Sequence, residues 1–296
     1  MRIFRVPNGS TGHPFRMFPL ALGFFLLPIA LAAQGTSQQT TSPPRPGRSI
    51  ALALKSMAAL TPGAPINNVT LTGTITLANA PNAGSGTITL SATADGQSQV
   101  TMSLPSGQQT EIRSYSRMSH TGTWTDSEGA SHDFSVMNTL GPHPAWYYPA
   151  FVMQHGFMST QYFAGDLGPA TWDGASVEHL QIFRRPWSAR YKPAVVNPFL
   201  KQMSLYDIYL DPSSLLPVAM TFNVHLDSAN PTQFLVPPGT PAGDYLEEIR
   251  FSDYRQVQGR PVAFRVQVYF NGELSADIQL ASANFEGEAA TAAGQQ

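Results

Sequence analysis

Strict two-residue alternation of apolar and polar side chains runs through segment after segment of this chain. In VTLTGTITL, residues 69–77, apolar side chains alternate with threonines, and TITLSATA, residues 87–94, repeats the pattern. Similar runs occupy residues 217–226 and 261–270. Because successive side chains of a strand point to opposite faces, this alternation predicts strands with one face on a core and the other in water.

Short turn sequences separate these runs. Asp95-Gly96 and Asn271-Gly272 are typical of two-residue hairpins, which join antiparallel neighbours. Further strands are expected around residues 109–118 and 131–138, and one helix over residues 48–60 with Ser49 as its N-cap. The fold class is therefore mainly β (α+β): a large curved antiparallel sheet or half-open β-barrel, with a few helices over its apolar concave face.

The N-terminus has the features of an export signal. Arg2, Arg5 and Arg16 provide a positive region, an apolar run follows over residues 17–33, and Ala30-Leu31-Ala32 forms an A-x-A cleavage site. The run is shorter than the ~20 residues that a spanning helix needs, although an uncleaved anchor is the alternative. We expect residues 1–33 to be a signal peptide and the mature protein to be periplasmic or secreted, without a membrane span.

The rest of the chain reads as one domain with flexible ends. Residues 34–47 are polar and proline-rich and are expected to form a leader, residues 48–287 a single domain, and residues 288–296 a disordered tail. The chain has no cysteine, so stability must come from a hydrophobic core instead of disulfides. Its net charge is −2, with no basic cluster, and this excludes nucleic acid as an expected partner.

The sequence contains no recognisable catalytic, metal or cofactor motif. It lacks an H-x-H or H-E-x-x-H spacing, a G-x-S-x-G elbow and a glycine-rich phosphate loop. Glu247 and Glu248 are adjacent on an expected strand and so face opposite ways, which prevents them from flanking one bond. We therefore predict no catalytic residue, no metal site and no cofactor. Four histidines are evenly spaced but lack the short spacing of metal ligands, so we expect them to face solvent on strands and loops: His120, His132, His143 and His155.

Three segments together resemble the LolA-like family of periplasmic lipoprotein carriers. The first is Asp173-Gly174 with Val177, His179 and Leu180; the second is YDIYLDPSSLLPVAM, residues 206–220; the third is IRFSDYRQVQG, residues 249–259, followed by Phe264-Arg265 and Asn271-Gly272. Within the third, Asp253-Tyr254-Arg255 is expected to stabilise the hairpin turn. The chain departs from the family pattern at Ala263, where a proline is common, and in residues 185–200 and 228–244.

This resemblance implies a half-closed antiparallel barrel whose helices cap an apolar cavity. In the carriers that cavity holds acyl chains, so the implied ligand is a lipid or the acyl chain of a lipoprotein. A LolA-like fold alone does not settle function. The alternative is an envelope protein-interaction or sensor module with a filled core and a protein partner, and an exported hydrolase is a weaker third reading.

The aromatic stretch GPHPAWYYPAFVMQHG, residues 141–156, interrupts the strands. Pro149 suits the first turn of a helix and Gly156 its end, so residues 149–155 are expected to be a short helix, with Trp146, Tyr147 and Tyr148 leading into it in extended conformation. The helix is interpreted either as a lid over the cavity or as a plug within a filled core. The residues expected to line the cavity and its lid are Val69, Leu71, Ile75, Ile88, Leu90, Met102, Trp146, Phe151, Val152, Met153, Met220 and Phe222.

Overall fold

The structure is a computed structural model that describes most of the expected domain. Described are residues 46–63, 66–78, 83–115, 120–134, 144–158, 162–184, 202, 204–226, 235–236 and 239–285. The chain divides into two units, residues 1–36 and 37–296, and all described residues belong to the second. The predicted signal peptide and C-terminal tail therefore lie outside the described residues, as do residues 185–200, 228–234 and 237–238.

The described residues form one antiparallel sheet of thirteen strands. Its order is β6-β5-β4-β3-β2-β1-β13-β12-β11-β10-β9-β8-β7. The strands are β1 (Asn68–Leu77), β2 (Gly84–Thr93), β3 (Ser98–Leu104), β4 (Gly107–Tyr115), β5 (His120–Thr125), β6 (Ser131–Asp133), β7 (Tyr162–Trp172), β8 (Ala175–Arg184), β9 (Tyr206–Leu210), β10 (Pro217–Leu226), β11 (Gly243–Val257), β12 (Arg260–Phe270) and β13 (Glu273–Asn284). Strand is the dominant structure of these residues, so the mainly β prediction is confirmed.

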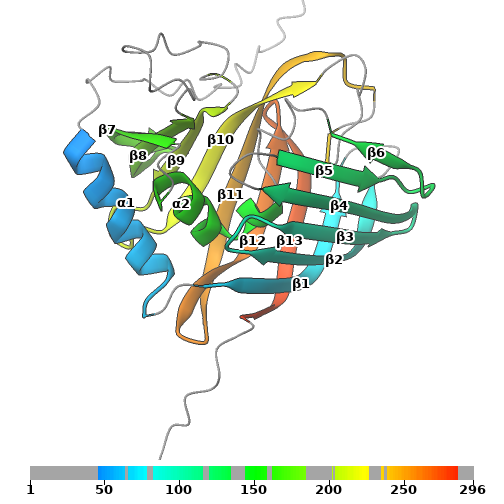
Figure 1. Ribbon diagram of the computed structural model, residues 1–296, viewed down its shortest axis with the longest axis horizontal. Helices are drawn as coiled ribbons and strands as arrows, with labels where there is room; N and C mark the ends of the chain where they lie inside the picture. Colours follow the sequence, from blue (N-terminus) through cyan, green and yellow to red (C-terminus); the bar gives the residue numbers. More distant parts are fainter. Residues whose placement is uncertain are drawn as a thin grey trace, which may run out of the picture. The chain divides into compact units, whose positions relative to one another are not determined.

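The sheet is strongly curved. Strands β4 and β11 are six places apart in the order, which in a flat sheet would separate them by about 29 Å. Nevertheless, the charges of Glu111 and Arg113 on β4 act on the carboxyl group of Glu247 on β11. Figure 1 shows β2–β5 running across the view in front of the steeper strands β11–β13. The two walls therefore face each other across an interior, as expected of a half-barrel.

A glycine at a bulge permits the close pairing of β1 with β13. The register between these strands shifts at Thr72 and Gly73. A Cβ atom at Gly73 would lie 2.2 Å from the backbone oxygen of Gln279, so no larger residue fits without moving the strand. Bulges bend a strand and increase its twist, and this one lies near the middle of the sheet order.

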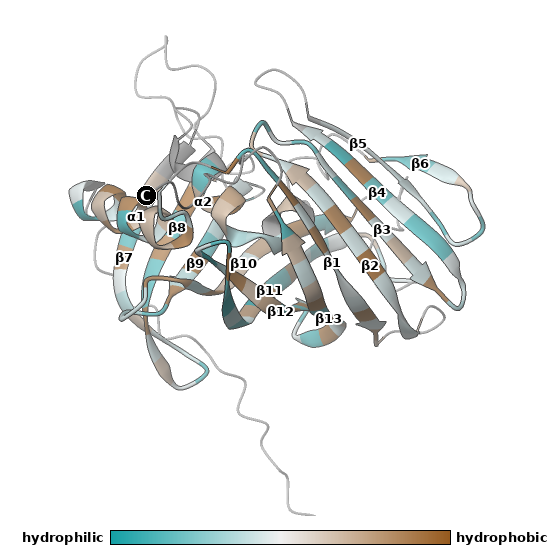
Figure 2. Cartoon of the chain, turned by 90° about the horizontal axis from the view of Figure 1, so that it is seen from below, coloured by the Kyte–Doolittle hydropathy of each residue, from teal (hydrophilic) through white to brown (hydrophobic). Residues whose placement is uncertain are grey.

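The two faces of the sheet differ as the alternation predicts. The inner face carries most of the hydrophobic core, and Figure 2 shows hydrophobic and hydrophilic bands alternating along β2–β4. On the outer face, the strand registers place five threonines in one row across β1–β5. These are Thr72, Thr89, Thr101, Thr110 and Thr125. Cross-strand threonine pairs stabilise a sheet modestly, which gives this polar face a structural role.

Helix α1 (Pro46–Leu60) starts two residues before the expected position. Pro46 occupies its first turn, so Ser49 lies inside the helix, and its hydroxyl donates to the backbone oxygen of Ala164 at 3.2 Å. The prediction of Ser49 as the N-cap was wrong. Arg48 binds Asp166 on β7 and Glu178 on β8, at 2.9 Å each, and so fixes α1 against that end of the sheet.

Some local expectations were wrong. Strands β5 and β7 had not been expected. The strand expected at residues 131–138 is present as β6 at Ser131–Asp133, and residues 135–138 lie outside the described residues. Asp253-Tyr254-Arg255 lies within β11 and not at the turn, which is formed by Gln258 and Gly259. Asp253 has a φ of 54° where the register with β12 is interrupted, and its carboxylate binds Arg255. None of the described helices has the length and apolar character to cross a membrane.

Candidate functional site

A short helix occupies the interior of the curved sheet. It is α2 (Pro149–Met158), preceded by the single 3-10 turn η1 (Pro144–Tyr147). Pro149 begins α2 as expected, but the helix continues through Gly156, because one glycine costs a helix only about 1 kcal/mol. The expected extended conformation of residues 146–148 was also wrong, since Tyr148 donates its backbone N–H to the oxygen of Ala145 at 3.1 Å.

The side chains of α2 are packed into the core. Phe151 and Met153 are 0% exposed, and Val152 is buried with them in the same apolar cluster as the sheet. The rings of Phe151 and Tyr148 meet edge to face at 5.3 Å. The hydroxyl of Tyr148 is buried and makes no hydrogen bond with any described residue, and this burial raises its pKa. In this structure, α2 fills the interior.

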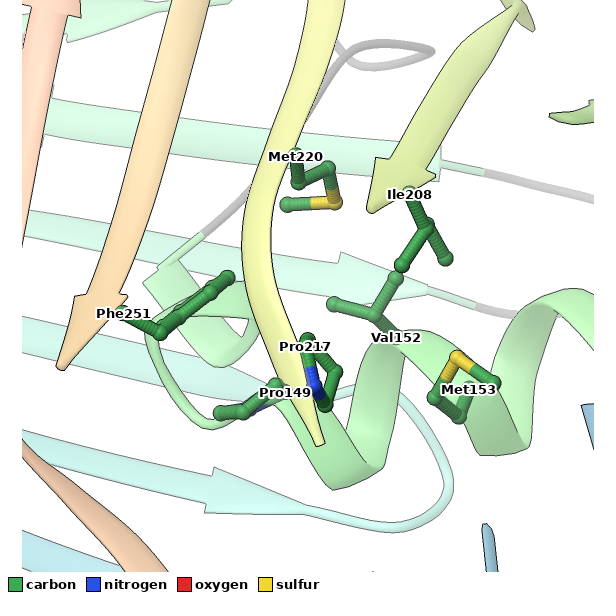
Figure 3. Close-up of a pocket in the computed structure, with 7 residues that line it drawn as sticks. All are labelled: Pro149, Val152, Met153, Ile208, Pro217, Met220 and Phe251. Carbon is green, nitrogen blue, oxygen red and sulfur yellow. The ribbon is translucent and has the colours of Figure 1, made fainter. Parts of the chain in front are cut away.

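A small apolar cavity remains between α2 and the sheet. It is bordered by α2, β9, β10 and β11 and is too narrow to hold even a water molecule. Figure 3 shows Val152 of α2 pointing toward Ile208 of β9, with Met220 of β10 beside them. The lining residues are Pro149, Val152, Met153, Ile208, Pro217, Met220 and Phe251. Cavities for drug-sized ligands usually measure about 300–1,000 Å³, so a long acyl chain does not fit here unless α2 moves.

The predicted site residues come together in space. Eleven of the twelve belong to one buried cluster, and Val152, Met153 and Met220 also border the cavity. The side chain of Trp146 lies outside the described part of the chain. The predicted site lacked four residues that border the cavity: Pro149, Ile208, Pro217 and Phe251. Ile208 and Phe251 each stand in an alternating run (residues 206–210 and 249–251) that could have identified them. Whether these residues bind a ligand stays a prediction.

One stretch of the inner face is polar, contrary to expectation. On β4, Gln109, Glu111 and Arg113 are buried, whereas Ile112 points outward and is 47% exposed. Arg113 donates from Nε to Glu111 Oε1 at 2.6 Å, and its guanidinium lies 3.5 Å from the ring centroid of Phe134.

Gly122 on β5 provides the room for the Arg113 side chain. A Cβ atom at Gly122 would lie 2.6 Å from Arg113 Cδ and 3.0 Å from a ring carbon of Phe134. The position therefore needs a glycine as long as Arg113 is folded inward.

The carboxyl group of Glu247 on β11 is influenced by the charges of Glu111 and Arg113 on β4. In register it lies between Phe222 on β10 and Phe270 on β12. Burial, and then the negative charge of Glu111, raise the pKa of Glu247 to about 8, and burial raises that of Glu111 despite the opposing effect of Arg113.

Tyr147 of η1 is influenced by the same carboxyl groups. The pKa of Tyr147 is raised by burial first, and then by the negative charges of Glu247 and Glu111. We call Glu111, Arg113, Glu247 and Tyr147 the interior polar cluster. Glu248, the next residue on β11, instead pairs with Arg250, which confirms that the two glutamates face opposite ways.

A second polar and aromatic group lies outside the main core. Nε2 of His179 and Oδ1 of Asp207 are 2.9 Å apart, and the ring of His179 stacks on Tyr209, which also contacts Trp172. Val177, Tyr209 and Ala219 form their own small apolar cluster here. This packing accounts for the histidine of the first family-like segment without assigning it chemistry. Among the described residues, no three His, Asp or Glu side chains are grouped to hold a metal ion.

The comparisons with known proteins place the fold. No family model matches the sequence. No curated protein matches it either. A solved domain from Vibrio parahaemolyticus, named for outer membrane lipoprotein sorting, aligns with a TM-score of 0.52 at 13% identity, over 82% of this chain and 94% of that one.

Two further solved structures align over similar lengths. A DUF1329 family protein from Desulfovibrio piger has a TM-score of 0.50 at 10% identity, over 81% of this chain and 93% of its own. A LolA superfamily protein from Nitrosomonas europaea has a TM-score of 0.47 at 10% identity, over 81% and 94%. At these identities the likeness concerns the fold alone. The chain has the LolA-like fold of lipoprotein-sorting domains.

Proposed function

We propose that this protein is an exported, non-catalytic carrier that binds a lipid-like or acylated ligand in the apolar interior of its curved sheet. One observation carries the proposal: the element that fills this interior is α2, a separate ten-residue helix packed against the sheet by Phe151, Val152 and Met153. A ligand with an apolar chain can replace these side chains against the same sheet residues. The LolA-like fold supports the same reading.

Two properties of α2 favour its displacement. A helix of this length is marginal by itself, so its order depends on the contacts it makes with the sheet and α1. In addition, the buried Tyr148 hydroxyl has no partner among the described residues, which costs about 1–3 kcal/mol relative to a hydrated group. Displacement of α2 would return that hydroxyl to water, so the packed state carries a cost that ligand binding relieves.

Because α2 fills the interior, the stability of its packing and the affinity for a ligand should change in opposite directions. In the lid reading the side chains of α2 touch the ligand, but α2 lies within the interior and so competes with the ligand for the sheet. The apparent affinity then depends on the fraction of molecules in which α2 has moved. Changes that weaken α2 packing should strengthen ligand binding.

The second candidate is an envelope protein-interaction or sensor module. The complete burial of Phe151 and Met153 favours it, as does a cavity too narrow for a water molecule, because a permanently filled core leaves no volume for a ligand. In that case α2 is a plug, and recognition uses the outer face or the loops. The described residues offer no feature that favours the third reading, an exported hydrolase.

The decisive experiment is extraction of the mature protein, purified from envelopes without detergent, followed by mass spectrometry of the organic phase. A carrier yields a bound acyl species near stoichiometric amounts, and the emptied protein binds a fluorescent fatty-acid probe. Absence of both the co-purified species and probe binding would favour the interaction module. N-terminal sequencing of the same sample should find a start near Ala33 or Gln34, whereas an intact N-terminus on membranes would contradict export with cleavage.

A further inference from the structure

We propose that the outer face of strands β1–β5 is the contact surface of a homodimer, where it packs against the same face of a second copy of this chain. We call the outward-facing positions of these five strands the outer wall. The inference goes beyond the proposed function and does not depend on it, because the outer wall points away from the interior in which a ligand would bind.

The outer wall carries no charged side chain. At every outward-facing position of these five described strands the residue is Thr, Ser, Asn or Gln, with Ile112 as the exception. Charges return on both sides of it. Asp277 of β13 binds Arg265 of β12 at 2.7 Å, and Asp133 stands on β6 at the other margin. This arrangement is typical of a protein–protein interface, whose centre is depleted of charged residues and whose rim is polar.

The chemistry of the outer wall fits a second copy of itself. A surface with a net charge repels an identical surface, whereas hydroxyl and carboxamide groups both donate and accept hydrogen bonds, so two identical faces of this kind can pair. Some hydroxyls already pair within the sheet: Thr72 lies 2.7 Å from Ser282, and Thr76 lies 2.9 Å from Ser85. A hydroxyl offers one donor and two acceptor positions, so these residues keep capacity for a partner across the contact.

Ile112 provides the outer wall with an apolar anchor. Its side chain is 47% exposed, while its neighbours on β4, Glu111 and Arg113, are buried on the inner face. In register it stands between Gln99 of β3 and Thr123 of β5, within the outer wall and not at its margin. In a two-fold symmetric contact both copies bury this side chain, which adds apolar area to a face made mostly of hydroxyl groups.

The outer wall is large enough for a specific contact. In Figure 1 the arrows of β2–β5 run nearly parallel across the view, and Figure 2 shows β1–β4 side by side in one layer. Five strands spaced about 4.8 Å apart and about 20–33 Å long cover roughly 600–700 Å². Two such faces bury about 1,300 Å² in total, above the ~1,000 Å² expected of a biological interface. In the resulting dimer both interiors open away from the contact, so each remains accessible.

The test introduces charge at Thr101, which lies on the middle strand of the five, between Thr89 of β2 and Thr110 of β4. The mature protein, without ligand, is followed by analytical ultracentrifugation from about 1 µM to 1 mM. The parent should form a reversible dimer. Thr101→Lys and Thr101→Glu should each weaken it at least tenfold, because like charges then face each other across the contact. An equimolar mixture of the two variants should recover the dimer, since its charges are opposite, and this recovery also shows that both variants are folded.

The matched control is Ser252→Lys, an exposed position on the outer face of β11 and outside the outer wall, which should leave association unchanged. Ile112→Thr should weaken the dimer roughly tenfold without altering the circular dichroism spectrum. Sedimentation as a monomer over the whole range would overturn the inference. So would a dimer that Thr101→Lys does not weaken, or a mixture that fails to recover it. None of these results depends on ligand binding, so the carrier proposal is tested separately.

Discussion

Replacement of Phe151 by alanine distinguishes a displaceable α2 from a permanent plug. The side chain is 0% exposed and packs edge to face on Tyr148 at 5.3 Å. Truncation of a fully buried phenylalanine costs about 3–5 kcal/mol when the side chain stays buried in every native molecule. The aromatic pair contributes about 0.5–1.5 kcal/mol of that amount.

A displaceable α2 limits this loss. If molecules with α2 displaced lie only a few kcal/mol above the packed state, Phe151→Ala shifts the native population toward them, because Phe151 is already out of the core there. The free energy of unfolding, from urea titration followed by circular dichroism, should then fall by less than about 3 kcal/mol. Affinity for a fluorescent fatty-acid probe should rise at the same time, since more molecules are competent to bind.

A core residue of the sheet provides the control. Ile278 on β13 is buried between strands β1 and β12, so Ile278→Ala should show the whole cost of about 2–5 kcal/mol and no gain in probe affinity. The reasoning would be refuted by a loss of about 3–5 kcal/mol for Phe151→Ala together with no probe binding by either protein. That result would identify α2 as a plug.

Three further outcomes follow from the structure. Tyr148→Phe removes a buried unpaired hydroxyl and should raise the free energy of unfolding by about 1 kcal/mol while weakening probe binding; a loss of stability in urea titration would contradict this. The raised pKa of Glu247 gives stability that is fully present below pH 4.5 and lost as the pH rises to about 8, by at most about 1.4 kcal/mol per pH unit. Glu247→Gln should therefore flatten the pH dependence of urea unfolding between pH 5 and 8, and an unchanged slope would argue against a raised pKa of this carboxyl group. Gly73→Ala forces a Cβ against the backbone oxygen of Gln279 and should lower stability by about 3 kcal/mol, whereas a neutral effect on the thermal midpoint would show that the bulge adjusts.

The sheet could be predicted because its signal is local. Alternation within residues 69–77 and 217–226 is set by each strand alone, and turn residues identify the antiparallel neighbours. Strand β7 was missed because Gly165, Gly168 and Pro169 interrupt its pattern, and Gly168 indeed adopts a φ of 88° at a bulge. Such residues weaken the local signal although the strand still pairs with β8 on both sides of the bulge.

The contents of the interior could not be predicted in the same way. Phe151, Val152 and Met153 are equally compatible with a lid and a plug, since both bury an apolar helix against the sheet. The choice depends on how far the walls curve, which is a property of all thirteen strands.

The interior polar cluster depends on the same long-range geometry. From the sequence alone, Glu111 and Arg113 would be placed on the outward polar face and Ile112 on the inward face. The register with β3 and β5 instead places Glu111 opposite Val100 and Trp124. The approach of Glu247 to Glu111 joins residues 136 positions apart in sequence, so no local pattern reports it.

Hydrogen exchange of the α2 backbone, with and without a saturating twelve-carbon amphiphile, tests the central claim most directly. If the ligand replaces α2 in the interior, the amides of residues 153–158 should exchange faster when ligand is bound, while those of β10 and β11 remain protected. Slower or unchanged exchange in α2 at saturation would contradict the account, because α2 would then still occupy the interior with the ligand bound elsewhere.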